Sequence, residues 1–482
     1  MINLKIVGLV LGILLIIEGF FMLFSVPVSL IYKEQDFWQI TLACLLTIGV
    51  GAALYLSFRK SSKEIGTREG YIIVSLGWVV ASLFGALPFY FTGAIPSYTD
   101  AFFETMSGFT TTGASILNDI EALSHGLLLW RSTTQWLGGM GIIVLTLVIL
   151  PVLGFGGMQL FFAEVPGISS DKLHPRIKET AKRLWGIYVV FTFAEIILLT
   201  AGGMDLFDSV CHSFTTLATG GYSTKNASIA HYSSPYIQYV IIFFMYLAGI
   251  NFTLSYFALK LKFKPFFKDE EFRKYTFFIL FFSLVITVIL VVSNDQPLEK
   301  SFRDALFQVV SIITTTGFVT SDYLKWLPIG SVILFALMFF GGSTGSTGGG
   351  MKIARIVLLL KNSSLELKRL IHPNAVIPVR LNNQAISPQT MTNVLAFASF
   401  YVLIVMASVI IVSFMGYDLD TSFGAVVTSI GNIGPGIGEV GPMFNFSHFP
   451  AIGKWFLSFL MLIGRLELFT VLILFSRHFW KN

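Results

Sequence analysis

The sequence predicts an all-α polytopic membrane protein in which two leading transmembrane helices precede four membrane–pore–membrane repeats, arranged around a pseudo-fourfold pore. Three observations support this prediction. Hydrophobic residues make up 54% of the 482 residues and charged residues only 12%, whereas a soluble domain carries about 25% charged residues. Long apolar segments recur along the chain, and a short motif that ends in glycine occurs four times between pairs of them.

The apolar segments are long enough to cross a bilayer, which takes about 20 mainly apolar residues. The first segment is too long for the core of a signal peptide and lacks a small-residue cleavage site, so we expect it to remain as a span. Two segments are unusually long, and we expect them to extend past the bilayer or to break inside it; they are 127–160 and 328–361. The complete set of ten expected spans is 5–31, 38–58, 71–93, 127–160, 185–203, 236–260, 275–293, 328–361, 392–415 and 451–477.

These spans and the four motifs divide the chain into five units. The two leading helices occupy 1–70, and the repeats occupy 71–184, 185–274, 275–391 and 392–482.

The distribution of basic residues predicts the orientation, because cytoplasmic loops carry an excess of Lys and Arg. Of the 32 Lys and Arg residues, only seven fall on one side: Lys33, Arg131, Lys225, Lys300, Arg303, Lys325 and Lys454. The opposite, basic side is therefore expected to be cytoplasmic, with both termini inside. All four glycine motifs then enter the membrane from the outside.

The four motifs are Phe109-Thr-Thr-Thr-Gly113, Leu217-Ala-Thr-Gly220, Ile313-Thr-Thr-Thr-Gly317 and Gly431-Asn-Ile-Gly434, with steps of 107, 97 and 117 residues between their last glycines. Each follows a short amphipathic run such as 98–112, whose length of about 20 Å is half a bilayer. The chain must then return as irregular backbone, which is tolerated at membrane depth only where protein or water surrounds it. The sequence therefore favours four half-helices around one pore; the alternative is four re-entrant turns that pack a transporter core without conducting.

Backbone carbonyl oxygens at these motifs can replace the water around an alkali-type cation, and glycine permits the backbone conformation that turns them toward one axis. The carbonyls that directly precede the glycines are the first candidates: Thr112, Thr219, Thr316 and Ile433. The full set of predicted filter residues is Thr111, Thr112, Gly113, Ala218, Thr219, Gly220, Thr315, Thr316, Gly317, Asn432, Ile433 and Gly434.

Further segments resemble a known family. They are Gln135-Trp-Leu-Gly-Gly-Met-Gly-Ile142, Pro175-Arg-Ile-Lys-Glu-Thr-Ala-Lys-Arg-Leu-Trp185, Gly341-Gly-Ser-Thr-Gly-Ser-Thr-Gly-Gly-Gly-Met-Lys352 and Gly464-Arg-Leu-Glu-Leu-Phe469. Together with the filter motifs, they resemble the Trk/Ktr/HKT superfamily of potassium uptake proteins, in particular its TrkH branch, over nearly the whole chain.

The resemblance implies a K+ channel-like pore in each subunit of a homodimer in the cell inner membrane, with K+ as the bound ion. In the family, glycine at the first filter accompanies potassium selection and serine marks sodium-favouring relatives; this chain has Gly113 there. The family is controlled by a separate cytosolic ring, TrkA, that binds NAD(H) or ATP, and this implies docking near 172–184, 262–274 and 361–391.

The middle of the predicted span 328–361, residues 341–350, contains six glycines that would each cost about 1 kcal/mol relative to alanine inside a helix: Gly341, Gly342, Gly345, Gly348, Gly349 and Gly350. We therefore expect an unwound loop over 341–350, and the resemblance implies that it is the gating loop. The alternative is a glycine-rich packing surface between helices.

Arg465 lies deep in the last span, where an arginine costs about 2.5–3.5 kcal/mol to insert. We expect it to face the pore, to repel cations and to contact the gating loop. A structural ion pair with Glu195 or another buried acid is the alternative.

The function classes left are a gated pore and, as the alternative, a secondary transporter that couples K+ to H+ or Na+ through Glu18, Glu195 or Glu467. No ligand-type cluster of histidine, carboxylate and cysteine occurs among the seven histidines, and we expect no enzyme activity. The chain has no nucleotide motif, so we expect it to bind no nucleotide itself. Its basic loops serve orientation and membrane lipids, and we expect no nucleic-acid partner.

Overall fold

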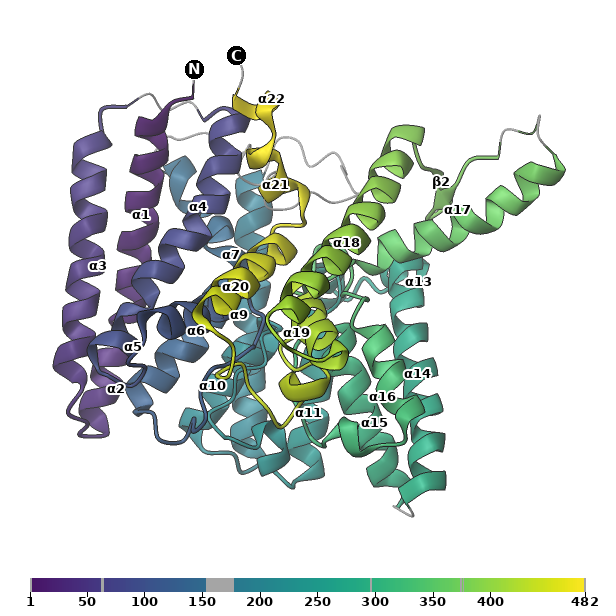
Figure 1. Ribbon diagram of the computed structural model, residues 1–482, viewed down its shortest axis with the longest axis horizontal. Helices are drawn as coiled ribbons and strands as arrows, with labels where there is room; N and C mark the ends of the chain where they lie inside the picture. Colours follow the sequence, from purple (N-terminus) through teal and green to yellow (C-terminus); the bar gives the residue numbers. More distant parts are fainter. Residues whose placement is uncertain are drawn as a thin grey trace.

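The computed structural model describes residues 2–61, 65–152, 177–294, 297–372, 375 and 377–480. Over these residues the chain is mainly helical, with one short hairpin formed by antiparallel β1 (Arg380–Leu381) and β2 (Gln384–Ala385). The N- and C-termini lie at the same end of the molecule (Figure 1).

The leading unit contains α1 (Leu4–Met22), α2 (Ser25–Ile31) and α3 (Phe37–Phe58). α1 packs against both α3 and α4 (Thr67–Gly85). The turn between α2 and α3 is fixed to the following unit by Glu34, which accepts a hydrogen bond from the backbone N of His125 at 2.7 Å. Asp36 also accepts hydrogen bonds from the hydroxyls of Ser29 and Ser124. The leading helices are therefore joined to the rest of the fold by partly buried polar contacts as well as by apolar packing.

The remaining helices follow a repeated order of a long helix, a short helix and a broken helix. The first group is α4, α5 (Leu87–Phe91), α6 (Tyr98–Phe109) and α7 (His125–Val152). The second is α9 (Ile177–Ala201), α10 (Leu206–Leu217), α11 (Pro235–Ala248) and α12 (Phe252–Leu259). The third is α13 (Lys264–Lys268), α14 (Glu270–Asn294), α15 (Leu298–Ile313), α16 (Pro328–Leu337) and α17 (Ile353–Ile371).

The fourth group is α18 (Pro388–Phe414), α19 (Leu419–Gly431), α20 (Ala451–Arg465), α21 (Phe469–Leu472) and α22 (Arg477–Trp480). Within the described residues, four 3-10 helices lie in the connections: η1 (Ser228–His231), η2 (Tyr323–Lys325), η3 (Gly438–Val440) and η4 (Ile473–Phe475).

The helices α6, α10, α15 and α19 contain 12, 12, 16 and 13 residues, so a 12-residue member is about 18 Å long and cannot cross a bilayer. Side chains cap the starts of three of them, as when Asp205 accepts from the N of Phe207 at 2.9 Å. Each ends where a residue enters the left-handed region, with φ between 53° and 58°: Thr111, Thr219, Thr315 and Asn432. The predicted half-helix over 98–112 therefore stops at Phe109.

Six of the predicted spans correspond to helices that are long and apolar enough to cross a membrane. The short helices α6, α10, α15 and α19 were not predicted as spans. Two predicted spans, 236–260 and 451–477, are not straight: α11 and α12 form an angle of 112°, as do α20 and the segment after it. These two spans are therefore bent, a feature that was not expected from the sequence. Asn251 starts a new helix by accepting from the N of Thr253, and Glu467 and Leu468 adopt φ values of 58° and 55°.

The two long predicted spans are both interrupted. α7 is broken at Gly141, where φ is 74°, and residues 153–160 of that predicted span lie outside the described residues. The span 328–361 is interrupted between Leu337 and Ile353, so the predicted break exists and is longer than the expected 341–350. The segment 172–176 of the predicted first docking loop also lies outside the described residues.

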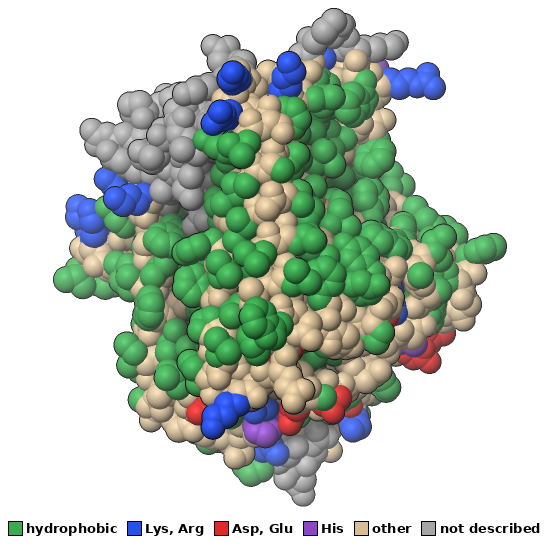
Figure 2. All heavy atoms as spheres, turned by 90° about the vertical axis from the view of Figure 1, so that its left-hand side faces the viewer, with side chains coloured by type: hydrophobic (Ala, Val, Ile, Leu, Met, Phe, Trp, Pro, Cys, Tyr) green, Lys and Arg blue, Asp and Glu red, His purple; other side chains and the backbone are tan. Residues whose placement is uncertain are grey.

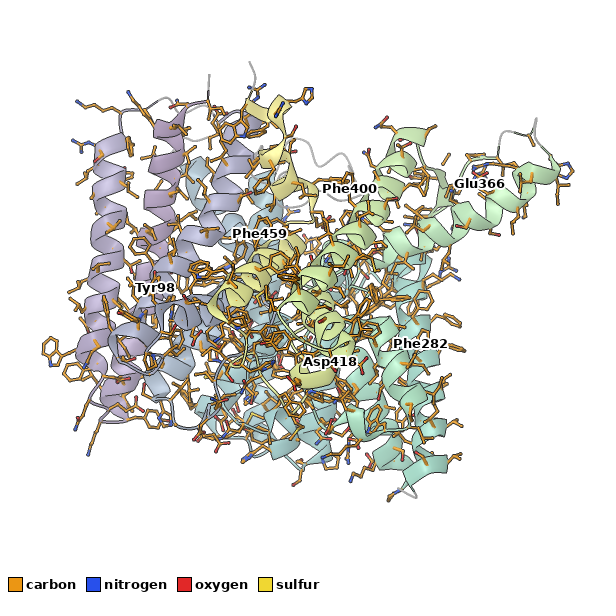
Figure 3. The ribbon with its side chains drawn as sticks, viewed as in Figure 1. Tyr98, Phe282, Glu366, Phe400, Asp418 and Phe459 are labelled. Atoms are coloured by element: carbon orange, nitrogen blue, oxygen red, sulfur yellow. The ribbon has the colours of Figure 1, made fainter. Side chains whose placement is uncertain are left out.

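On the face that Figure 2 shows, a broad hydrophobic surface covers the middle of the molecule, and charged side chains gather toward the two ends. Exposed apolar side chains on α3, such as Trp38 at 68% and Leu45 at 60%, contribute to the apolar exterior. Figure 3 shows Phe282 on α14 and Phe400 on α18, while Glu366 lies on the part of α17 that projects from the helical body. An apolar middle between polar ends is typical of a protein that is surrounded by lipid.

Candidate functional site

The four loops that follow the short helices touch one another in a closed order. A Cβ placed on the glycine of each loop would lie 2.0 to 2.8 Å from a carbonyl oxygen of the next loop. The pairs are Gly113 with Gly220, Gly221 with Thr316, Gly317 with Ile433, and Gly434 with Thr112. Because the fourth loop contacts the first, the four carbonyl-bearing residues form a ring.

The second loop is shifted by one residue from its predicted alignment. Gly221 has a φ of +75°, similar to the +80° of Gly113, whereas the φ of Gly220 is not positive. The N of Gly220 donates to the carbonyl of Thr215 at 2.9 Å, as the N of Thr112 does to Ser107 at 2.8 Å. Gly220 thus occupies the position of Thr112, and Gly221 that of Gly113. The correction arises because the motif carries two successive glycines and sequence spacing does not distinguish them.

The consequence is that the carbonyl of Gly220, and not that of Thr219, belongs to the ring. Thr219 corresponds to Thr111, and Ala218 to Thr110, the residue at the helix end. In the other three repeats, the residues placed by the sequence immediately before the glycine do contribute the ring carbonyls.

The side chains of Gln135 and Asn432 form hydrogen bonds with residues of the ring. Gln135 Nε2 donates to the carbonyl of Gly220 at 2.7 Å, and its Oε1 accepts from the N of Tyr222 at 3.0 Å. Asn432 Nδ2 donates to Thr112 Oγ1 at 2.9 Å, which connects the fourth loop to the first. Polar groups at this depth are fixed by such bonds because an unpaired buried donor is costly.

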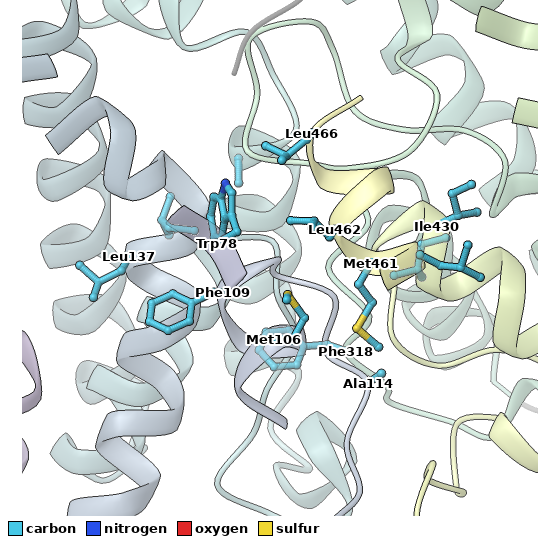
Figure 4. Packing of buried hydrophobic residues seen from close by; sticks show 14 of the residues in the cluster. Trp78, Met106, Phe109, Ala114, Leu137, Phe318, Ile430, Met461, Leu462 and Leu466 are labelled. Carbon is cyan, nitrogen blue, oxygen red and sulfur yellow. The ribbon is translucent and has the colours of Figure 1, made fainter. Parts of the chain in front are cut away.

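Apolar packing holds the inner ends of the short helices. Figure 4 shows Phe109 beside Leu137, with Trp78 above it, and Met461 between Ile430 and Ala114. Phe109, Met461 and Ile430 are completely buried, at 0% exposure. The loops are therefore supported by a dense core drawn from several repeats.

The glycine-rich segment of the third repeat lies against the inner ends of these loops. The N of Gly349 donates to Thr315 Oγ1 at 2.7 Å, and Thr347 Oγ1 donates to the carbonyl of Leu217 at 3.0 Å. The segment is closed at its base, where the N of Gly341 donates to the carbonyl of Met351 at 2.8 Å. The predicted break thus contacts the second and third short helices, and the alternative of helical glycine packing is wrong.

Arg465 connects this segment to the first repeat. Its guanidinium donates to the carbonyl of Thr347 at 2.7 Å, to that of Gly139 at 3.0 Å, and also to that of Gly138. The predicted contact between Arg465 and the glycine-rich segment is therefore present. Neither oxygen of Glu195 has a hydrogen-bond partner among the described residues, so the alternative pairing with Arg465 is not formed by a hydrogen bond.

Charged side chains anchor both flanks of the segment. Glu271 accepts from the N of Thr344 at 2.7 Å and from the N of Ala354 at 3.1 Å. The Lys352 ammonium donates to the carbonyl of Gly348, and Arg355 forms an ion pair with Glu467. Glu467, a predicted coupling carboxylate, is thus a contact between α17 and the end of α20.

Sequence reasoning missed Gln135, Glu104, Arg131 and Tyr222. Arg131 was counted with the basic residues of the outer side, yet its side chain is only 3% exposed and it pairs with Glu104 at 2.8 Å. Gln135 stands in a segment that carried the family resemblance, which was a usable signal. The other three have no local pattern, because their partners lie on other elements.

Comparison with known proteins decides the family. The family model for TrkH, described as a cation transport protein, matches residues 37–481. The chain belongs to the TrkH family. The resemblance stated from the sequence is therefore confirmed, and TrkH-family membership makes this a transport protein.

Individual TrkH relatives match over the full length. The chain is 41% identical over 479 residues to the Trk system potassium uptake protein TrkH of Escherichia coli K12, covering 98% of both chains. It is 40% identical over 483 residues to TrkH of Halomonas elongata, covering 100% of both. The crystal structure of the potassium transporter TrkH from Vibrio parahaemolyticus matches with a TM-score of 0.90 and 37% identity over 100% of both chains.

Proposed function

We propose that this protein takes up potassium across the inner membrane through a gated, K+-selective pore whose filter consists of backbone carbonyls. The closed ring of contacts among the four loops is the observation that carries the proposal. The names of its relatives, which are potassium uptake proteins, support the choice of ion.

The ring offers the chemistry that the transport of an alkali cation needs. Carbonyl oxygens replace the hydration shell of the ion, and no side-chain donor set is required. The C-terminal ends of α6, α10, α15 and α19 adjoin the ring, and each such end carries about half a negative charge. Four negative helix ends around one axis favour a cation and disfavour an anion.

The gate in this proposal is the segment between Leu337 and Ile353, fastened beneath the ring by Arg465. Its contacts with Thr315 and Leu217 support an obstructing position. Displacement of the segment would break these bonds and clear the path.

The experiment is bi-ionic K+/Na+ recording of the purified protein in bilayers, for the wild type and for Gly113→Ser. Serine at a φ of +80° is strained, and its Cβ would meet the carbonyl of Gly220. We expect the K+/Na+ permeability ratio to fall by about tenfold, which corresponds to about 1.4 kcal/mol.

Gly93→Ser is the matched control, because Gly93 also has positive φ, at +73°, yet no atom lies within 4 Å of its added Cβ. It tests backbone strain outside the ring and should keep the wild-type ratio. An unchanged ratio in Gly113→Ser, with normal expression, would contradict the proposed filter.

A coupled secondary transporter is the second candidate. It is favoured by Glu18 and Glu195, which are 1% and 0% exposed and whose carboxylate oxygens have no hydrogen-bond partner among the described residues. Buried carboxyl groups within spans can act as proton relays. A pore gives a reversal potential that follows the K+ gradient alone, whereas a proton-coupled carrier gives one that shifts with pH.

We further propose that the protein works as a homodimer in contact with membrane lipids, with both termini cytoplasmic, and under the control of a cytosolic TrkA-like ring that binds NAD(H) or ATP. The basic loops around 262–274 and 361–391 suit an acidic docking surface. Co-purification with the ring and a nucleotide-dependent change in open probability are the tests. Absence of both would contradict this regulation.

A further inference from the structure

A buried ion pair connects the first short helix to α7. Arg131 Nε lies 2.8 Å from Glu104 Oε1, and the side chains are 3% and 0% exposed. The same helix carries a second ion pair, Asp100 with Lys454 at 2.7 Å, in which the aspartate side chain is 27% exposed. Burial makes the first pair sensitive to the loss of either partner, because a buried charge without its partner is strongly unfavourable.

The carboxylate of Glu104 holds the backbone that leaves the first filter loop. It accepts hydrogen bonds from Ser115 Oγ at 3.0 Å and from the N of Ile116 at 2.9 Å. These two residues lie just after Gly113 in the chain, separated from it by Ala114. Glu104 therefore holds the segment that leaves the first filter loop against α6, the helix on which Glu104 lies.

Arg131 extends the same contact to the second loop. Its Nη1 donates to the carbonyl of Ser223 at 2.9 Å, and its guanidinium lies 3.5 Å from the ring centroid of Tyr222. Tyr222 in turn donates its hydroxyl hydrogen to the carbonyl of Glu104 at 2.6 Å. The ion pair thus braces the first and second loops together at the point where the Gly113 loop meets Gly220.

The positions that correspond to Glu104 in the other three repeats carry no carboxylate. The position seven residues before the left-handed residue is His212 in the second repeat, Gln308 in the third and Ala425 in the fourth. His212 Nε2 lies 2.9 Å from Ser223 Oγ, and Gln308 Nε2 donates to Thr320 Oγ1 at 3.5 Å. In three repeats, the side chain at this position therefore bonds to the segment that leaves the filter loop. Of the four residues, only Glu104 carries a carboxylate.

We propose that Glu104 and Arg131 are positioning residues of the filter, which set the spacing of the first two loops and thereby the discrimination between K+ and Na+. The inference rests on the proposed carbonyl filter. It assigns selectivity to a charge pair that does not itself contact the ion.

The test compares Glu104→Gln with Asp100→Asn in bi-ionic recordings of the full-length protein. Both substitutions remove one charge from an ion pair on the same helix and keep the side-chain shape. We expect Glu104→Gln to lower the K+/Na+ permeability ratio by about tenfold, and Asp100→Asn to leave the ratio at the wild-type value. A merely structural role would lower the thermal stability of Glu104→Gln and leave the ratio of the folded protein unchanged, which would overturn the inference.

Tyr222→Phe provides the decision if Glu104→Gln fails to fold. It removes only the hydroxyl that bonds to the carbonyl of Glu104 and keeps the ring beneath Arg131. A lowered ratio in Tyr222→Phe supports the inference, and an unchanged ratio overturns it. Gly113→Ser separates the two levels of the argument: if it lowers the ratio while Glu104→Gln and Tyr222→Phe do not, the filter stands and the positioning role falls.

Discussion

Arg465 joins the glycine-rich segment, the first repeat and the last broken helix through one guanidinium. Its hydrogen bonds to three backbone carbonyls use the planar fork of arginine, and hydrogen bonds from charged donors contribute about 1.5–3 kcal/mol each. In the proposed gate, a residue with this arrangement would stabilise the closed position of the segment. In the same proposal, it would also place a positive charge near the permeation path.

Replacement of this side chain by glutamine is therefore expected to open the pore. Arg465→Gln removes the charge and most of the donors, and we expect K+ flux into proteoliposomes to rise by about tenfold or more. The measurement is ⁸⁶Rb+ uptake driven by a K+ gradient, normalised to the amount of folded protein.

Arg465→Lys separates the two effects of the residue. Lysine keeps the charge but not the fork, so a raised flux in this variant identifies the hydrogen bonds as the closing element. A wild-type flux in Arg465→Lys identifies charge repulsion instead. Wild-type flux in both variants would contradict any role of Arg465 in closure.

At the residue level, the sequence predicted most of the candidate site. The motifs supplied the ring carbonyls of three repeats, and the insertion cost of an arginine in a span drew attention to Arg465. The sequence did not show which of Gly220 and Gly221 adopts the positive φ, because any glycine can adopt that conformation. The pair of Glu104 and Arg131 was missed because residues 27 positions apart in the chain meet only through the packing of α6 on α7.

The glycine-rich segment is the element on which the proposed gate depends. A Cβ on Gly349 would lie 2.7 Å from the carbonyl of Gly431 and 2.8 Å from Asn432 Cβ. The segment therefore fits against the fourth loop only with a glycine at this point. A methyl group there must push the segment away from the ring.

We expect Gly349→Ala to raise the single-channel open probability by about tenfold, since about 1.4 kcal/mol of lost closed-state contact is sufficient. Gly330→Ala is the control on the same broken span, because its added Cβ meets only ordinary contacts at 3.6 Å from Trp326. Equal open probabilities in the two variants would argue against contact between the segment and the ring as the closing interaction.

At the level of elements, length and hydropathy predicted the straight spans, and glycine content predicted the break before Ile353. The bends after Ala248 and Arg465 were not predictable from composition. The second bend occurs at Leu466-Glu-Leu468, which contains neither glycine nor proline, and left-handed residues there persist only where tertiary contacts hold them. The ion pair of Glu467 with Arg355 is such a contact.

The whole molecule is organised by the closure of the ring from the fourth repeat to the first. Beyond the ring itself, the N of Phe446 donates to the carbonyl of Ser115 at 2.8 Å, and Tyr323 donates to the carbonyl of Gly436 at 2.7 Å. These bonds join the fourth repeat to the first and the third to the fourth. Four repeats of different sequence thus form one continuous structure in which each loop depends on its neighbours.

Orientation in the membrane is the remaining property of the whole molecule, and it follows from the uneven distribution of basic residues. The end that carries the segments leaving the four filter loops should face the outside, and the end with α13 should face the cytoplasm. Ala122 and Lys262 are exposed residues of these two ends. The native Cys44 and Cys211 are both buried, which gives a low background for thiol labelling.

We expect a membrane-impermeant maleimide to label Ala122→Cys in intact cells, and to label Lys262→Cys only after permeabilisation. The wild type, with its two buried thiols, is the control and should stay unlabelled in both conditions. Labelling of Lys262→Cys in intact cells, with protection of Ala122→Cys, would invert the topology. The four half-helices would then enter from the cytoplasm, and the proposed order of an outer filter above an inner gate would fail with it.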